Sequence, residues 1–229
     1  MNITLLSALT ATAVATALLG AGAPAQAFSF GTNAITFQED TDVSFKFQES
    51  HGQYTSSFGI YSVKDSATTL ISTLFSETKS SDNGGDNEWK GSLGNTVLGS
   101  GSAVFKFLAN QVYTLGLSSG GDGTVYSTSA LNAGTQQAVF GGSGLWGELG
   151  KETTSTFQAA GQYTDGTGSL KSGGTTISFD DRGNKNDKDF QDFTVSAEAV
   201  PEPITMTGLA LGFGGLVAAR RRRASKTVA

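Results

Sequence analysis

Alternation of apolar and polar residues at period two is the feature that most restricts the fold of this chain. The pattern occurs in Val-Ser-Phe-Lys-Phe at 43–47, Phe-Gly-Ile at 58–60, Tyr-Thr-Leu-Gly-Leu at 113–117 and Phe-Thr-Val-Ser-Ala at 193–197. Side chains of a strand point alternately to its two faces, so the pattern predicts strands with one buried face. No ten-residue stretch between 28 and 200 has the apolar stripe of a helix.

Clusters of Gly, Ser, Asp and Asn separate these segments and predict turns and loops. A two-residue break, Ala109-Asn110, separates segments 103–108 and 111–117 and predicts a β-hairpin. We therefore predict an all-β fold for residues 28–200, an antiparallel β-sandwich that is jelly-roll-like. The predicted loops are 80–87, 118–123, 141–144 and 165–174.

The inward positions of the predicted strands should form the core. Burying a large apolar side chain stabilises a fold by about 1.5 to 3 kcal/mol before the entropy of ordering is counted. Most aromatic residues are therefore interpreted as core residues. The predicted core consists of Phe37, Val43, Phe45, Phe47, Phe58, Ile60, Phe105, Phe107, Leu115, Leu117, Phe179, Phe193 and Val195.

Charge is distributed unevenly along the chain. Residues 28–203 contain all 20 acidic residues but only 10 of the 15 basic ones, a net charge of −10. Nucleic-acid binding needs clustered Lys and Arg, so we expect no nucleic-acid partner. The sequence has no Cys, which excludes disulfides and thiolate metal sites and permits passage through an oxidising compartment.

Residues 1–27 have the pattern of a secretory signal peptide and predict an N-terminal signal helix. An apolar stretch at 5–19 precedes a Gly- and Pro-rich break and then Ala25-Gln26-Ala27, an A-x-A cleavage site. Signal peptidase is expected to cut after Ala27. The first three residues contain no Lys or Arg, which departs from the usual pattern, and a buried first helix is the alternative.

The C-terminal end has three successive parts. Pro201, Glu202 and Pro203 precede sixteen uncharged residues at 204–219. These predict a single transmembrane helix of about 24 Å, slightly shorter than the roughly 30 Å hydrocarbon core, with a buried C-terminal helix as the alternative. An Arg cluster follows and would stay in the cytoplasm, leaving the acidic domain outside. The cluster consists of Arg220, Arg221, Arg222 and Arg223.

This succession of Pro-Glu-Pro motif, short apolar helix and Arg cluster resembles the PEP-CTERM sorting signal of Gram-negative and cyanobacterial envelope proteins. The resemblance covers residues 201–229. It implies recognition by an exosortase, a transpeptidase-like membrane protease that cuts near the motif and discards the helix. It also implies a precursor in the inner membrane and a mature form at the cell surface or in the extracellular matrix, often alongside exopolysaccharide.

An acidic segment at 180–192 is the densest candidate site, with five Asp and two Asn in thirteen residues. Ca²⁺ takes about six to eight oxygen ligands, which short carboxylates of one loop are able to supply. The spacing is not that of an EF-hand, and three basic residues dilute the negative charge. A calcium loop and a solvated turn with Asx caps therefore both stay open. The candidate metal ligands are Asp180, Asp181, Asp187, Asp189 and Asp192.

Segments 42–47, 54–61 and 187–193 resemble an uncharacterised β-rich domain of bacterial surface proteins. That family closes on a D-x-D-[FY]-x-D acidic loop, and Gln191 stands here where an Asn is common. Members often accompany calcium-binding or adhesive architectures. The resemblance therefore implies a surface role, but residues 76–171 contain no motif of the family.

Two tryptophans are candidate glycan-binding residues. Trp89 and Trp146 each lie near a carboxylate, as a sugar-stacking Trp often does, and a partly buried strand Trp is the alternative. A second acidic group, Asp82, Asp86 and Glu88, is interpreted as ordinary turn chemistry, with a metal site as the alternative.

Catalytic motifs are weak in this sequence. His51 is the single His and is expected to be exposed in a turn, and no G-x-S-x-G motif accompanies it. We therefore predict a non-enzymatic, exported surface or matrix protein that acts as a calcium-assisted binding or structural module. A secreted glycan hydrolase with two carboxylates about 5 to 9.5 Å apart is the alternative. A coat protein without a ligand is a third possibility.

Overall fold

The computed structural model describes residues 28–83, 89–120, 123–141, 170, 174–181 and 190–201. This part of the chain is all-β, with two antiparallel sheets and the short 3₁₀ helix η2 (Ser129–Asn132). No helix within it is long and apolar enough to cross a membrane. The predicted signal peptide and the sorting signal after Pro201 lie outside the described residues.

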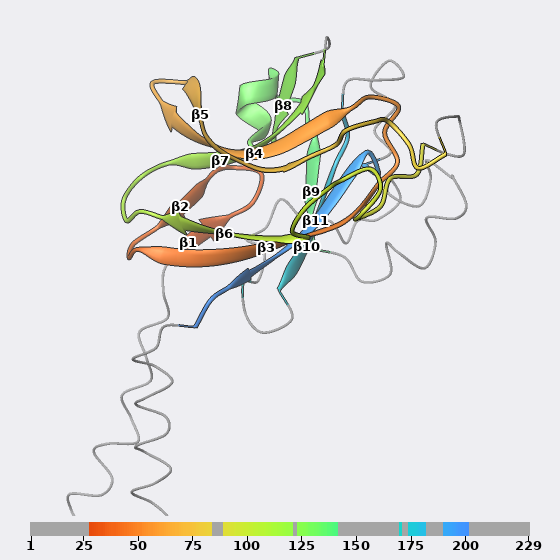
Figure 1. Cartoon of the computed structure of the whole chain (residues 1–229). Coiled ribbons are helices and arrows are strands. Elements are labelled where there is room, and N and C mark those ends of the chain that lie inside the picture. Colours follow the sequence, from red (N-terminus) through yellow and green to blue (C-terminus); the bar gives the residue numbers. More distant parts are fainter. Residues whose placement is uncertain are drawn as a thin grey trace, which may run out of the picture.

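The first sheet, here called sheet A, has the strand order β1-β2-β7-β4-β5, with β8 also paired to β7 (Figure 1). All of these pairs are antiparallel. The strands are β1 (Phe28–Phe30), β2 (Ile35–Phe37), β4 (Ser56–Lys64), β5 (Ala67–Ser76), β7 (Tyr113–Ser119) and β8 (Thr124–Tyr126).

The second sheet, sheet B, has the order β6-β3-β11-β10-β9 and is antiparallel throughout. In the long pair of β3 and β11, Ser50 lies opposite Phe193 and Val43 opposite Ala199. The start of β11 therefore lies at the end of β3. The strands are β3 (Thr41–Ser50), β6 (Ser102–Phe107), β9 (Ala138–Phe140), β10 (Thr175–Phe179) and β11 (Phe193–Ala199).

Side chains of the two sheets form one hydrophobic core. Phe58 of sheet A stacks on Phe193 of sheet B with ring centroids 5.8 Å apart, and it meets Phe179 edge-on at 5.7 Å. Such geometries add about 0.5 to 1.5 kcal/mol to the stabilisation from burial. The predicted core is confirmed, except that Phe105 is only partly buried against it.

The predicted hairpin between 103–108 and 111–117 is wrong. β6 pairs with β3 in sheet B and β7 pairs with β4 in sheet A, so the connection crosses from one sheet to the other. Phe107 and Tyr113, on either side of this crossing, meet edge-on in the core with centroids 5.1 Å apart. Alternation of apolar and polar residues fits both a hairpin and a crossing between sheets. Two strands bury the same apolar side chains whether they pair within one sheet or lie in two sheets packed face to face.

Candidate functional site

The predicted acidic segment joins β10 to β11 at one end of sheet B. Asp180, Asp181 and Asp192 are described and buried, with 0, 2 and 9% exposure, whereas Asp187 and Asp189 lie outside the described residues. Asp180 Oδ2 accepts a hydrogen bond from the side-chain amide of Gln137 at 3.2 Å. The interpretation as a solvated turn is therefore wrong for these three carboxylates, because neighbouring segments cover them.

Asp181 and Asp192 meet beside Gly52, in the turn after β3. Asp192 Oδ2 accepts a hydrogen bond from the Asp181 backbone N–H at 2.6 Å. The N–H groups of His51 and Gly52 donate to the Asp192 carbonyl at 3.2 and 3.3 Å. A Cβ on Gly52 would lie 3.3 Å from both Asp181 Oδ2 and Asp192 Oδ1. The lack of a side chain at Gly52 thus leaves room for two carboxylates beside one point of the backbone.

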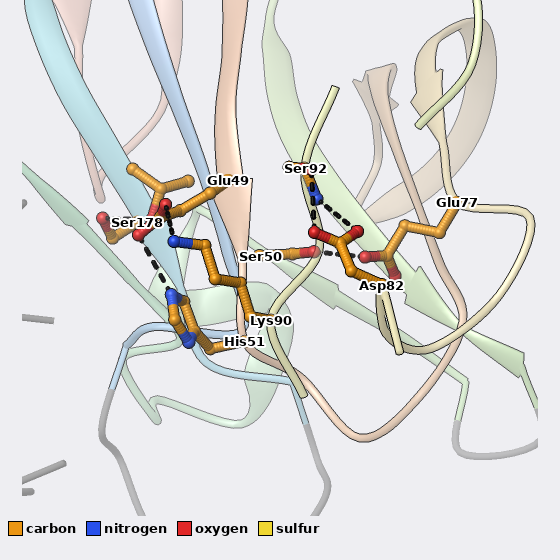
Figure 2. A network of polar contacts seen from close by, with 9 residues as sticks. Glu49, Ser50, His51, Glu77, Asp82, Lys90, Ser92 and Ser178 are labelled. Atoms are coloured by element: carbon orange, nitrogen blue, oxygen red, sulfur yellow. Dashed lines mark hydrogen bonds and ion pairs between the residues drawn. The ribbon is translucent and has the colours of Figure 1, made fainter. Parts of the chain in front are cut away.

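Glu77, beside sheet A, is a fourth buried carboxylate, and its sequence context did not mark it as a candidate. It directly follows β5 and is 7% exposed. Ser50 Oγ donates to one of its oxygens, as Figure 2 shows, and the Ser56 backbone N–H donates to the other at 2.8 Å. Burial raises the pKa of Glu77 to about 7; these hydrogen bonds oppose the shift, and the charge of Asp181 adds to it. We call Glu77, Asp181 and Asp192 the acidic cluster.

No sequence signal identified Glu77, because it is a single carboxylate at the end of a strand with no motif around it. The turn that carries the chain from β3 in sheet B to β4 in sheet A binds Glu77 and places it close enough to Asp181 for their charges to interact. Ser50 and Ser56 lie at the two ends of this turn and both bind Glu77. The acidic cluster therefore lies where the two sheets are joined.

His51 is buried, so the expectation of an exposed turn His is wrong. Its Nε2 lies 3.0 Å from Glu49 Oε1, and Lys90 Nζ lies 3.6 Å from Glu49 Oε2 (Figure 2). The neighbouring Ser50 hydroxyl donates to Glu77. This Ser therefore does not point its proton at an imidazole, as a Ser-His hydrolase would require.

Asp82 stabilises the loop between β5 and β6 through hydrogen bonds. Its carboxylate accepts hydrogen bonds from the Ser92 N–H at 3.1 Å, the Ser92 hydroxyl at 2.8 Å and the Thr96 hydroxyl at 2.6 Å. Partial burial opposes ionisation, but the hydrogen bonds outweigh it and hold the pKa of Asp82 below its ordinary value. These contacts fit the interpretation as turn chemistry. Asp86 and Glu88 lie outside the described residues.

The structure describes one of the two candidate glycan-binding tryptophans. Trp89 is half-buried and lies in a turn, not in a strand, with φ of +49°. Trp146 lies outside the described part of the chain. A glycan-binding role for each of these residues therefore stays a prediction.

The described residues at this end of the protein supply only some of the ligands that a metal ion needs. Among the described residues, no group of three or more His, Asp or Glu side chains is arranged to hold a metal ion. Asp181 and Asp192 bring two carboxylate oxygens to Gly52, fewer than the about six to eight that Ca²⁺ takes. A calcium site here would need further ligands from 182–189, the segment that contains Asp187 and Asp189.

The fold and the site define an all-β protein with two antiparallel sheets and a buried acidic cluster at their junction. No protein-family model, curated protein or solved structure matches the chain.

Proposed function

We propose that this chain is an exported surface or extracellular-matrix protein and a non-enzymatic, calcium-assisted binding or structural module. The observation that supports it best is the meeting of Asp181 and Asp192 at Gly52, with Glu77 close enough for Asp181 to perturb its ionisation. Buried carboxylates repel one another when ionised, and bound Ca²⁺ would supply the compensating charge. Extracellular modules bind Ca²⁺ at about 0.1 to 1 mM, so such a site would fill outside cells.

The two sheets are proposed as the layers of a jelly-roll-like β-sandwich. Ring contacts between the sheets support this arrangement. Phe47 of sheet B lies 6.1 Å from Phe75 of sheet A, and Phe140 of sheet B lies 5.6 Å from Phe30 of sheet A, measured between centroids. Interdigitated inner faces of this kind are typical of a sandwich core.

The position of the acidic cluster is consistent with a domain that is presented outward from a membrane. Asp192 precedes β11 and Pro201 lies shortly after it, so the two residues are about 30 Å apart along the strand at roughly 3.3 Å per residue. At the Pro201 end, the Val200 N–H donates to the Asp42 carbonyl at 2.8 Å. If Pro201, Glu202 and Pro203 are the exosortase motif, the acidic cluster lies at the end of the domain remote from the membrane anchor.

The partners in this proposal are signal peptidase at Ala27, an exosortase at the Pro-Glu-Pro motif and, once exported, a surface glycan such as exopolysaccharide. A glycan hydrolase is less well supported for the acidic cluster. Asp181 and Asp192 are 2 and 9% exposed, so a saccharide would not reach their carboxylates. Burial favours a role in ordering the protein over contact with a substrate.

The calcium proposal is tested by the thermal midpoint of the full chain, first in EGTA and then with Ca²⁺ up to roughly 10 mM. We expect a saturable rise that Asp181→Asn and Asp189→Ala abolish. Asp42→Asn, at the other end of sheet B, is the matched control and should keep the rise. A flat response of the unaltered chain would overturn the calcium proposal.

The sorting proposal has a separate test. Replacing Pro201, Glu202 and Pro203 with Ala should leave an uncleaved, membrane-bound precursor in cells that contain an exosortase. Unaltered processing and release would overturn the proposal without affecting the calcium result.

A further inference from the structure

β5 forms an open edge of sheet A, and in Figure 1 it lies at the outer margin of the molecule. Along Ala67–Ser76 it pairs with β4 on one side. On the other side, no backbone hydrogen bond joins it to another segment of the described chain. A neighbour first appears beyond the strand, where Glu77 bridges to Val97. Outward-facing N–H and C=O groups of an edge strand are a template for pairing with another strand.

The composition of β5 does not prevent such pairing. Its ten residues, Ala-Thr-Thr-Leu-Ile-Ser-Thr-Leu-Phe-Ser, include no charged residue and no Pro. Leu70 and Ile71 are 49 and 51% exposed. Edge strands are usually protected from pairing by charge, by Pro or by short length. β5 has none of these three protections.

The other edges of the described sheets are protected. β6, at the edge of sheet B, has the exposed Lys106 in its sequence. β1, β8 and β9 have three residues each. Within the described chain, β5 is thus the edge strand that is both long and uncharged.

We propose that β5 pairs antiparallel with β5 of a second copy of this chain, about a two-fold axis near Ile71 and Ser72. A two-fold interface is self-complementary, so each copy presents the same edge. Residues 28–203 have a net charge of −10, which opposes contact between copies at charged surfaces. β5 places no like charges opposite each other, so repulsion between its side chains is least there. This inference does not rest on calcium binding.

Two features make this association weak. Register shifts between β4 and β5 leave Ile71 and Leu74 as extra residues on β5, and such bulges bend an edge and weaken strand addition. One strand of ten residues also buries less than the roughly 800 Å² per partner of a typical stable interface. The dimer should therefore form reversibly and depend on protein concentration.

Single-cysteine cross-linking tests the pairing without competing disulfides, because the natural chain has no Cys. In a two-fold antiparallel pair one residue lies opposite its own copy, with Cα atoms about 4.5 to 5.5 Å apart that suit a disulfide, and Ile71→Cys and Ser72→Cys test the two positions nearest the proposed axis. Ala67→Cys and Ser76→Cys lie at the strand ends, about 30 Å from their copies. We expect at least about tenfold more disulfide dimer from a central variant than from either end variant of the full chain in EGTA. Equal yields at all four positions, or no dimer at any, would overturn the proposal.

Sedimentation velocity over a range of concentrations gives a second, non-covalent test. Ile71→Lys should make the full chain monomeric at concentrations where the unaltered chain dimerises. Val104→Lys on β6 is the matched control, since Val104 is 62% exposed on an edge that the proposal does not use. Circular dichroism establishes that both variants are folded. A dimer that survives Ile71→Lys, or an unaltered chain that is always monomeric, would refute self-pairing through β5.

Discussion

Asp192 Oδ2 accepts the backbone N–H of Asp181 at 2.6 Å and closes the acidic segment between β10 and β11 at its base. Both residues are buried, and the bond joins a carboxylate to an amide with little access to water. A buried N–H that loses its acceptor costs free energy, so this bond stabilises the fold. The contact therefore holds the two ends of the segment together whether or not a metal ion binds.

Asp192→Ala should lower the free energy of unfolding by about 1 to 3 kcal/mol, because the buried Asp181 N–H loses its acceptor. Asp192→Asn keeps an acceptor oxygen and should recover part of the loss. Urea denaturation of the full chain in EGTA measures both. Asp40→Ala is the control, since Asp40 accepts the Ala109 N–H at 3.0 Å in an exposed position. Equal losses for Asp192→Ala and Asp40→Ala would contradict the argument from burial.

Glu77 should make the protein less stable as the pH rises from about 4.5 to 7. Its pKa is raised from 4.5 to about 7, so the folded state keeps a proton that the unfolded chain has released. The resulting stabilisation is fully present below pH 4.5 and is lost as the pH rises through the folded pKa. Its full size is on the order of 3 kcal/mol, at 1.36 kcal/mol per pKa unit.

Glu77→Gln is neutral at every pH and should remove this slope. Urea unfolding of the two proteins between pH 4.5 and 7.5, in EGTA, makes the comparison. If the free energy of unfolding changes with pH in the same way for both proteins, Glu77 does not titrate in this range in the folded protein.

Gly59→Ala should destabilise the β4–β5 pair by about 1 to 3 kcal/mol. A Cβ there would lie 2.6 Å from the Ser72 carbonyl oxygen, a backbone atom that cannot rotate away, so β5 would have to shift. Ser62→Ala on the same strand removes one partly exposed hydroxyl and should change stability by less than about 0.5 kcal/mol. Thermal unfolding distinguishes the two. If the thermal midpoint of Gly59→Ala equals that of Ser62→Ala, β5 shifts to accommodate the Cβ without loss of stability.

Asp82→Ala should loosen the loop between β5 and β6, because Ser92 and Thr96 lose their shared acceptor. Limited proteolysis at pH 7 should cut this variant faster within residues 78–97 than it cuts Asn83→Ala, a neighbouring exposed control. The pKa of Asp82 is lowered, so its stabilisation is present above the ordinary value of 3.8 and is lost as the pH falls below it. Equal cleavage of the two variants would show that the hydrogen bonds to Asp82 do not stabilise this loop.

The composition of the acidic segment was enough to propose a site, but not to describe it. The sequence placed Asp181 and Asp192 in one segment, whereas their meeting at Gly52 depends on how the turn after β3 packs. Glu77 was missed because it approaches from the other sheet. His51 was expected in solvent, yet it is buried against Glu49, since local sequence does not reveal what covers a turn.

The sequence by itself determined the fold class and most of the core. Period-two alternation assigns Phe45 and Phe47 to one face of a strand whatever the partner strand is, because that assignment needs only the local backbone. The tertiary structure alone decided that β6 joins β3 and not β7, that Glu77 lies close enough to Asp181 for their charges to interact, and that β5 is left at an edge. Each of these results depends on contacts between segments far apart in the chain, which local alternation does not encode.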